Sequence, residues 1–159
     1  PTRRSSDLSI NGNRQVACSH KISVLTDMLF EEGNFDDADF LVLPGGMPGT
    51  MNLMEHEGLD KLLKKFNREN KNLAAICAAP SILGQKGLLD GKSATCYPGF
   101  EEKLTGADVI DRDVVECGNI ITSKGLGTAI DFALAIIKKL KGEDTAKKIA
   151  ASVIYRHYN

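Results

Sequence analysis

The chain has 159 residues, 42% of them hydrophobic, and its 20 basic and 21 acidic side chains give a formal net charge of −1. This length is typical of one domain with a single core, and the balanced charge does not favour nucleic acid or an anionic membrane as a partner. Because no apolar run approaches the roughly 20 residues that cross a bilayer and no secretory segment is recognisable, we expect a cytoplasmic protein with a small or neutral partner.

Short extended segments open the chain. Residues 8–16 predict a hairpin, because two strand-like pieces flank Asn11-Gly12, the dipeptide most favoured in tight turns. A further strand is predicted over 22–25. The acidic stretch that follows predicts a solvated loop rather than a metal site; its carboxylates are Glu31, Glu32, Asp36, Asp37 and Asp39.

From residue 40 onward, predicted strands alternate with predicted helices. Apolar runs indicate strands over 40–43, 73–77, 94–96 and 120–122, and helical spacing indicates helices over 57–67, 81–86, 128–140 and 143–155. A second hairpin is expected where 109–110 and 114–115 flank three charged residues. This alternation predicts one α/β domain, with a flavodoxin-like, doubly wound, mostly parallel sheet and helices on both faces.

For the helix over 128–140, the sequence predicts a capping pair and a buried face. Thr128 and Asp131 stand three positions apart, as a capping pair would. Ile130, Leu134 and Ile137 recur at helical spacing, so we expect them to form one buried face.

Four cysteines are widely spaced: Cys18, Cys77, Cys96 and Cys117. Without a C-x-x-C pair or histidines at ligand spacing, they predict neither a disulfide framework nor a zinc site. Three of them are interpreted as small buried hydrophobes. Cys77 differs because it ends an apolar strand and small residues follow it, which permits a sharp strand-to-helix elbow.

The start of a helix would favour the thiolate form of Cys77, through unsatisfied N–H groups and the helix dipole. A structural cysteine buried at a strand end is the alternative that the local pattern leaves open. Ligands of doubly wound sheets bind beyond the carboxyl ends of the strands, where Pro44-Gly45-Gly46 also lies. Its glycines allow a close approach of backbone N–H groups to a ligand, although the same sequence also makes an ordinary turn.

Four strings occur in consistent order: VACSHKISV, LVLPGGMPG, AAICAAP and ITSKGLGTAIDFALAIIKKL. They resemble the ThiJ/PfpI superfamily, in its protein deglycase branch. The resemblance implies a flavodoxin-like domain of the class I glutamine amidotransferase type, which is usually a homodimer. It also implies Cys77 as the nucleophile or redox-sensing cysteine, with the backbone N–H groups of Gly46 and Ala78 as an oxyanion hole.

The implied activity is of the protein deglycase or glyoxalase III type, without cofactor or metal. Its substrates would be reactive carbonyls, either methylglyoxal or early glycation adducts on proteins, in protection against oxidative stress. Two alternatives stay open. One is a non-enzymatic redox sensor or chaperone that uses oxidation of Cys77. The other is a cysteine peptidase or amidotransferase, which Ala78 disfavours because those relatives carry a histidine there.

The resemblance also suggests substrate-binding residues. Tyr97 stands in a turn where relatives can place a histidine, and a phenol donates hydrogen bonds but is a poor base at neutral pH. Gly45, Gly125 and Gly127 lie in loops that approach the pocket in relatives, and His20 begins a strand that faces the site or the dimer partner. Each also has a purely structural interpretation. Tyr97 could be a packing aromatic, Gly125 and Gly127 a flexible helix entry, and His20 a structural histidine.

The chain departs from its family at its start. The family domain ordinarily opens with a central strand and a helix whose glutamate hydrogen-bonds the cysteine, and neither is recognisable here. Residues 1–8 resemble a translated sequencing adapter. We therefore expect a non-native segment over 1–8 and an incomplete domain over 9–159, in which the thiol is placed correctly and the activity of the fragment itself stays open.

Overall fold

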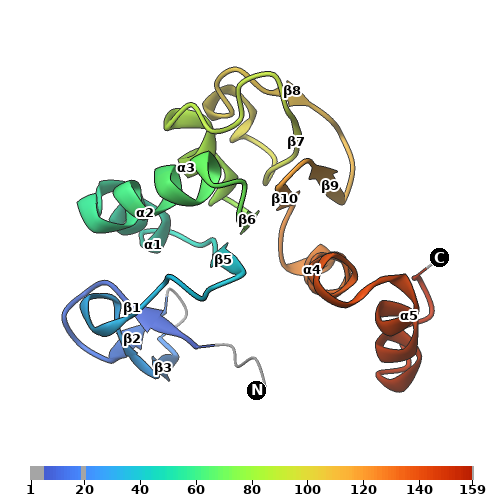
Figure 1. Ribbon diagram of the computed structural model, residues 1–159, viewed down its shortest axis with the longest axis horizontal. Helices are drawn as coiled ribbons and strands as arrows, with labels where there is room; N and C mark the ends of the chain where they lie inside the picture. The colour runs from blue at the N-terminus through green and yellow to red at the C-terminus, as the bar shows by residue number, and fades with distance from the viewer. Residues whose placement is uncertain (1–5, 19–20, 159) are drawn as a thin grey trace.

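The structure is a computed structural model, and it describes residues 6–18 and 21–158 (Figure 1). Its centre is a four-stranded sheet in the order β5 (Phe40–Leu43), β6 (Asn72–Ile76), β10 (Ile120–Ser123) and β9 (Val114–Cys117). The first three strands run parallel, and β9 is antiparallel to β10. Parallel strands end at one edge, so the turns after β5 and β6 lie side by side.

Helices cover both faces of this sheet. On one face, α2 (Glu57–Arg68) and α3 (Pro80–Gln85) close the main core, and α1 (Gly49–Glu55) leads into α2. The apolar face predicted for α2 is buried as expected, with Phe66 and Leu63 fully inaccessible. On the other face lies α4 (Ala129–Lys141), which also packs against α5 (Glu143–Ser152).

The helix α4 has two apolar sides rather than the single face that was predicted. Phe132 and Ala135 pack on the sheet, whereas Leu134 packs on α5. Ile130 is 47% exposed, so its assignment to a buried face was wrong. A helix between a sheet and another helix needs two apolar stripes, and a single stripe of period 3.6 describes only one of them.

The predicted capping pair was also wrong. Thr128 precedes α4, but its hydroxyl donates to the carbonyl oxygen of Gly125 at 3.0 Å instead of capping the helix. The Asp131 carboxylate accepts from the Tyr155 hydroxyl at 2.6 Å. Both side chains therefore serve loop contacts that the local sequence does not indicate.

Six short strands form three further pairs. β1 (Leu8–Ser9) pairs in parallel with β4 (Met28–Leu29), and β2 (Gln15–Ala17) pairs antiparallel with β3 (Ser23–Leu25). The hairpin predicted over 8–16 was therefore wrong. Ser9 and Asn13 accept hydrogen bonds from nearby backbone N–H groups and hold 9–15 as a loop, which competes with strand pairing.

The second predicted hairpin was wrong for a similar reason. β8 (Asp108–Val109) pairs in parallel with β7 (Ser93–Ala94), while β9 makes its hairpin with β10. Val115 on β9 is buried against the sheet, whereas Val109 is 42% exposed, so burial selects the β9–β10 pair. The other helical elements are short 3-10 helices of one turn, at Phe30–Glu32, Glu101–Lys103 and Leu126–Thr128.

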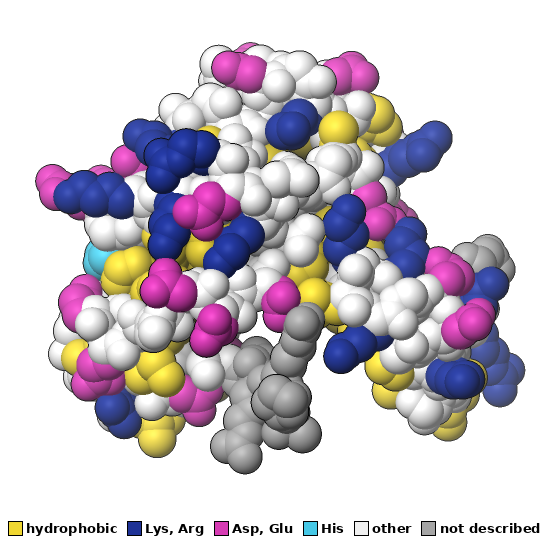
Figure 2. Space-filling model, viewed as in Figure 1, with side chains coloured by type: hydrophobic (Ala, Val, Ile, Leu, Met, Phe, Trp, Pro, Cys, Tyr) yellow, Lys and Arg dark blue, Asp and Glu magenta, His cyan; other side chains and the backbone are white. Residues whose placement is uncertain are grey.

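The surface carries both signs of charge. On the face shown in Figure 2, basic and acidic side chains are interspersed. In the part of the chain that the structure describes, no helix is long and apolar enough to cross a membrane.

Candidate functional site

Cys77 occupies a strained turn between β6 and α3. Its φ angle is 65°, a left-handed conformation that residues other than glycine seldom adopt. The N–H of Cys77 donates to the Ser123 oxygen at 2.9 Å, and the carbonyl of Cys77 accepts from the Tyr97 N–H at 2.9 Å. These two bonds fix the peptide groups on both sides of the thiol, and the result is the strand–turn–helix geometry of a nucleophile elbow.

The turn after β5 touches this elbow through Gly45. A Cβ atom built on Gly45 would lie 2.5 Å from the Cys77 Cβ and 2.7 Å from the Ile76 oxygen. Only glycine fits such a contact, since real Cβ atoms do not approach other atoms so closely. The two turns that the sequence singled out are therefore in direct contact.

Gly46 and Ala78 are the residues that follow Gly45 and Cys77 in the two turns. Gly46 has a φ angle of 92°, and its carbonyl accepts from the N–H and the hydroxyl of Thr50, at 2.9 and 3.0 Å. Thr50 is buried, so this peptide is held firmly. Among the residues that the structure describes, no acceptor takes a hydrogen bond from the amide of Gly46 or of Ala78.

Tyr97 and Gly125 lie on the other side of the elbow. A Cβ on Gly125 would meet the Tyr97 ring at 3.4 Å, so the ring lies against this glycine. Tyr97 is 49% exposed and joins the site through its backbone bond to Cys77. Gly127 lines a neighbouring cavity instead, and His20 lies outside the described residues.

A second thiol lies close to the first. Cys96 is 4% exposed, and its pKa is raised to about 11, first by burial, then by the negative charge of Glu101, and also by that of Cys77. Cys96 therefore stays a neutral thiol at physiological pH. Its interpretation as a small buried hydrophobe is confirmed, whereas Cys18 is exposed and Cys117 is half-buried, so those two interpretations were wrong.

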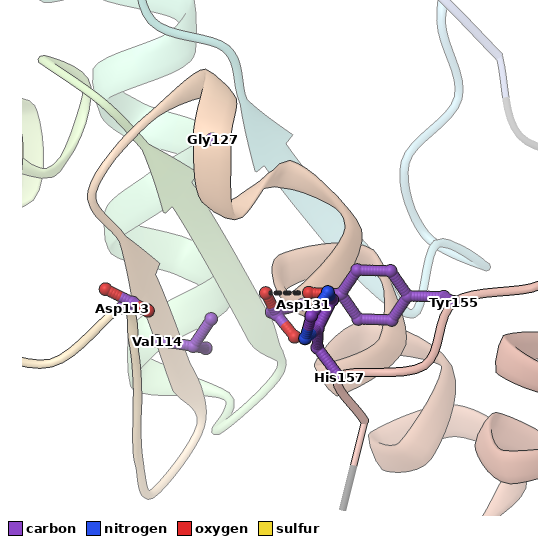
Figure 3. Close-up of a pocket in the computed structure, with 6 residues that line it drawn as sticks. All are labelled: Asp113, Val114, Gly127, Asp131, Tyr155 and His157. Atoms are coloured by element: carbon purple, nitrogen blue, oxygen red, sulfur yellow. Dashed lines mark hydrogen bonds between the residues drawn. The ribbon is translucent and has the colours of Figure 1, made fainter.

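A cavity of about 530 Å³ does not include Cys77 among its lining residues (Figure 3). Its walls are Asp113, Val114, Gly127, Asp131, Tyr155 and His157. The hydrogen bond from the Tyr155 hydroxyl to Asp131 raises the pKa of Tyr155, because the neutral phenol is the donor. Ser123 connects a wall of the cavity to the elbow. Its hydroxyl donates to the backbone carbonyl oxygen of Asp113, and its own carbonyl oxygen accepts from the N–H of Cys77.

The sequence prediction missed this cavity, apart from Gly127. Its acidic residues lie on separate elements, and the aromatic rings of Tyr155 and His157 come from the chain beyond α5. In the described part of the chain, no three His, Cys, Asp or Glu side chains gather as a metal ion would need.

Comparison with protein-family models gives a match that covers most of the chain. The DJ-1/PfpI family model matches residues 5–139. Protein dj-1beta of Drosophila melanogaster is 37% identical over 147 residues, which are 91% of this chain and 79% of that protein. A relative from Pyrococcus abyssi whose name calls it a deglycase is 38% identical over 129 residues, covering 79% of this chain and 76% of that protein.

A longer relative matches as well. Protein DJ-1 homolog B of Arabidopsis thaliana is 36% identical over 147 residues, which are 92% of this chain and 34% of that protein. The chain thus spans about a third of the length of this plant relative.

Solved structures agree with the fold. Oxidized Toxoplasma gondii DJ-1 superposes with a TM-score of 0.89 at 34% identity, over 94% of this chain and 82% of that one. Drosophila melanogaster DJ-1beta superposes with a TM-score of 0.88 at 35% identity, over 93% of this chain and 81% of that one. The predicted flavodoxin-like fold is therefore confirmed.

Proposed function

The chain belongs to the DJ-1/PfpI family, and from this premise we propose that it is a cysteine-dependent, cofactor-free enzyme that acts on reactive carbonyls. Its substrates are methylglyoxal or early glycation adducts on proteins. The observation that carries the proposal is the elbow, which holds Cys77 at a φ angle of 65° in contact with the turn at Gly45. The deglycase name of the Pyrococcus abyssi relative supports the same substrate class.

The first step is addition of the Cys77 thiolate to the carbonyl carbon. A C–S bond forms while the π electrons of the C=O bond move to oxygen, which gives a hemithioacetal anion. The amides of Gly46 and Ala78, which have no acceptor among the described residues, suit an oxyanion hole for that oxygen. Tyr97 suits a hydrogen-bond donor to a second substrate oxygen, since a phenol donates readily.

For methylglyoxal the remaining steps conserve all atoms. The thiolate adds to the aldehyde carbon. Transfer of the proton on that carbon to the neighbouring ketone carbon converts the hemithioacetal anion into a thioester of lactate. Water then cleaves the C–S bond, which releases lactate and restores the thiol of Cys77. The net reaction is addition of one water to methylglyoxal, so no oxidant or cofactor is consumed.

A second candidate function uses the same thiol without turnover. The Toxoplasma gondii DJ-1 structure is that of an oxidized protein, and this favours redox sensing or a redox-controlled chaperone role, in which oxidation of Cys77 changes stability or binding. For either function we propose a homodimer in the cytoplasm. A cysteine peptidase is less well supported, because Ala78 stands where such an enzyme needs a histidine.

The test is methylglyoxal turnover by protein expressed from the complete reading frame of its gene. We expect lactate formation by the unmodified protein, a loss of at least about 100-fold in Cys77→Ser, and an unchanged rate in Cys117→Ser. Cys117 is the matched control, because it is half-buried on β9. Equal rates for Cys77→Ser and the unmodified protein would remove Cys77 from the mechanism. A folded protein without turnover, whose Cys77 is the first thiol that peroxide oxidises, would support the second candidate.

A further inference from the structure

The backbone brings Cys96 next to Cys77. The Tyr97 N–H donates to the Cys77 carbonyl oxygen at 2.9 Å, and Cys96 is the residue whose carbonyl carbon is bonded to that nitrogen. Standard backbone dimensions then put the two Cα atoms roughly 5–7 Å apart. Disulfide-bonded cysteines have Cα atoms about 4.4–6.8 Å apart, so the two residues are within reach of a covalent link.

The side chain of Cys96 packs beneath the elbow. Cys96 belongs to the core cluster on the α2 and α3 face, together with Ala75 and Ala79, the residues two before and two after Cys77. The charge of Cys77 is also among the influences on Cys96, which is a sign of proximity. Cys77 is half-buried and Cys96 is buried, so an oxidant in solution meets Cys77 first.

The other two cysteines are placed differently. Cys117 ends β9 and pairs with Ile120, which pairs in turn with Leu73 at the start of β6, so Cys117 lies at the opposite end of the sheet from the elbow. Cys18 is exposed beyond β2. Of the described thiols, Cys96 is the one whose neighbouring peptide N–H, that of Tyr97, is hydrogen-bonded to Cys77.

We propose that Cys96 is the resolving thiol of the site, which condenses with an oxidised Cys77 to form a Cys77–Cys96 disulfide. The inference rests on the reactive thiol of the proposed function but not on its carbonyl substrate. Peroxide first converts the Cys77 thiolate into a sulfenic acid: the sulfur takes one OH group as the O–O bond breaks, and the other oxygen leaves as hydroxide, which takes a proton from solvent and becomes water.

The second step joins the two sulfurs. The Cys96 sulfur attacks the sulfenic sulfur, the S–O bond breaks, and the hydroxide takes up the thiol proton of Cys96 and leaves as a second water. A cellular dithiol or glutathione-class thiol reduces the disulfide and is itself oxidised. The disulfide keeps Cys77 from the irreversible sulfinic acid.

The test is stoichiometric hydrogen peroxide at pH 8, followed by trypsin digestion without reductant and mass spectrometry. Trypsin separates the two cysteines, because Lys86 and Lys92 lie between them. We expect a cross-link between peptides 72–86 and 93–103, two hydrogens lighter than their sum. In Cys96→Ala we expect no cross-link and at least about fivefold more sulfinic acid on Cys77. Cys117→Ala should retain the cross-link.

Other outcomes would overturn the inference. Equal sulfinic acid on Cys77 in the unmodified protein and in Cys96→Ala, without a cross-link, would do so, and the proposed function would then still be judged by methylglyoxal turnover. A cross-link from Cys77 to Cys18 or Cys117 would also contradict it. If Cys77 resists peroxide altogether, both the inference and the reactive thiol behind the proposed function fail. Should Cys96→Ala not fold, the presence or absence of the cross-link in the unmodified protein decides.

Discussion

Two regions of the chain differ in how they are held. Between residues 6 and 39, the strands have two or three residues each, and Ile22 and Leu25 are 65% and 75% exposed. Between residues 40 and 152, a four-stranded sheet supports a core in which Phe66 and Leu63 are completely buried. The described part of the first region packs against the margin of that core, through the partly buried side chains of Phe30, Phe35 and Ala38.

Each region contains cysteines, and the structure holds them differently. Cys18, in the first region, is the most accessible of the four thiols. Cys77, in the second, is less exposed but fixed by Gly45, Ser123 and Tyr97, all of which belong to the same region. Among the described residues, these contacts that hold Cys77 come from the sheet region and not from the short N-terminal strands.

The largest expected effect is on stability. Phe66→Ala removes a side chain with no accessible surface from the main core, and we expect a loss of about 3–5 kcal/mol. Leu25→Ala changes a side chain that is 75% exposed, and we expect a change within about 0.5 kcal/mol. Urea unfolding measures both. Similar losses for the two variants would show that the N-terminal region is as firmly packed as the sheet.

A smaller effect distinguishes two glycines, one in the turn after β5 and one at the start of α1. Gly45→Ala places a Cβ 2.5 Å from the Cys77 Cβ, so we expect a loss of about 1–3 kcal/mol and slower alkylation of Cys77 as the elbow shifts. Gly49→Ala is the control, because its Cβ meets nothing within 4 Å and it begins α1. We expect no loss of stability and an unchanged alkylation rate there. If Gly45→Ala behaves like Gly49→Ala, the contact between the two turns does not position the thiol.

Much of the sheet region was predictable because its signals are local. The apolar run at Phe40–Leu43 and the helical spacing of α2 each lie within a few residues, and the structure confirms both. The pairing of β1 with β4 and of β7 with β8 depends on distant segments. A strand of two residues carries too little pattern to specify its partner, so the predicted hairpins failed there.

The candidate site also contains features that local sequence predicts and features that depend on distant segments. Cys77 follows a buried strand and precedes small residues, a pattern that predicts the elbow, and Gly45 was found through its Pro-Gly-Gly turn. The proximity of Cys96 was missed, because it follows from a backbone bond between distant segments. The contact of Asp131 with Tyr155 was missed for the same reason, since it joins α4 to the chain after α5.

The most direct test of the account is the alkylation rate of each cysteine by iodoacetamide at pH 8, followed by mass spectrometry. We predict that Cys77 reacts first, ahead of the more exposed Cys18, because the sharp elbow after β6 presents its sulfur to the reagent. Cys96 should react last, since it is buried and its pKa is about 11. Alkylation of Cys18 before Cys77, in order of exposure alone, would contradict the claim that the elbow makes Cys77 the reactive thiol.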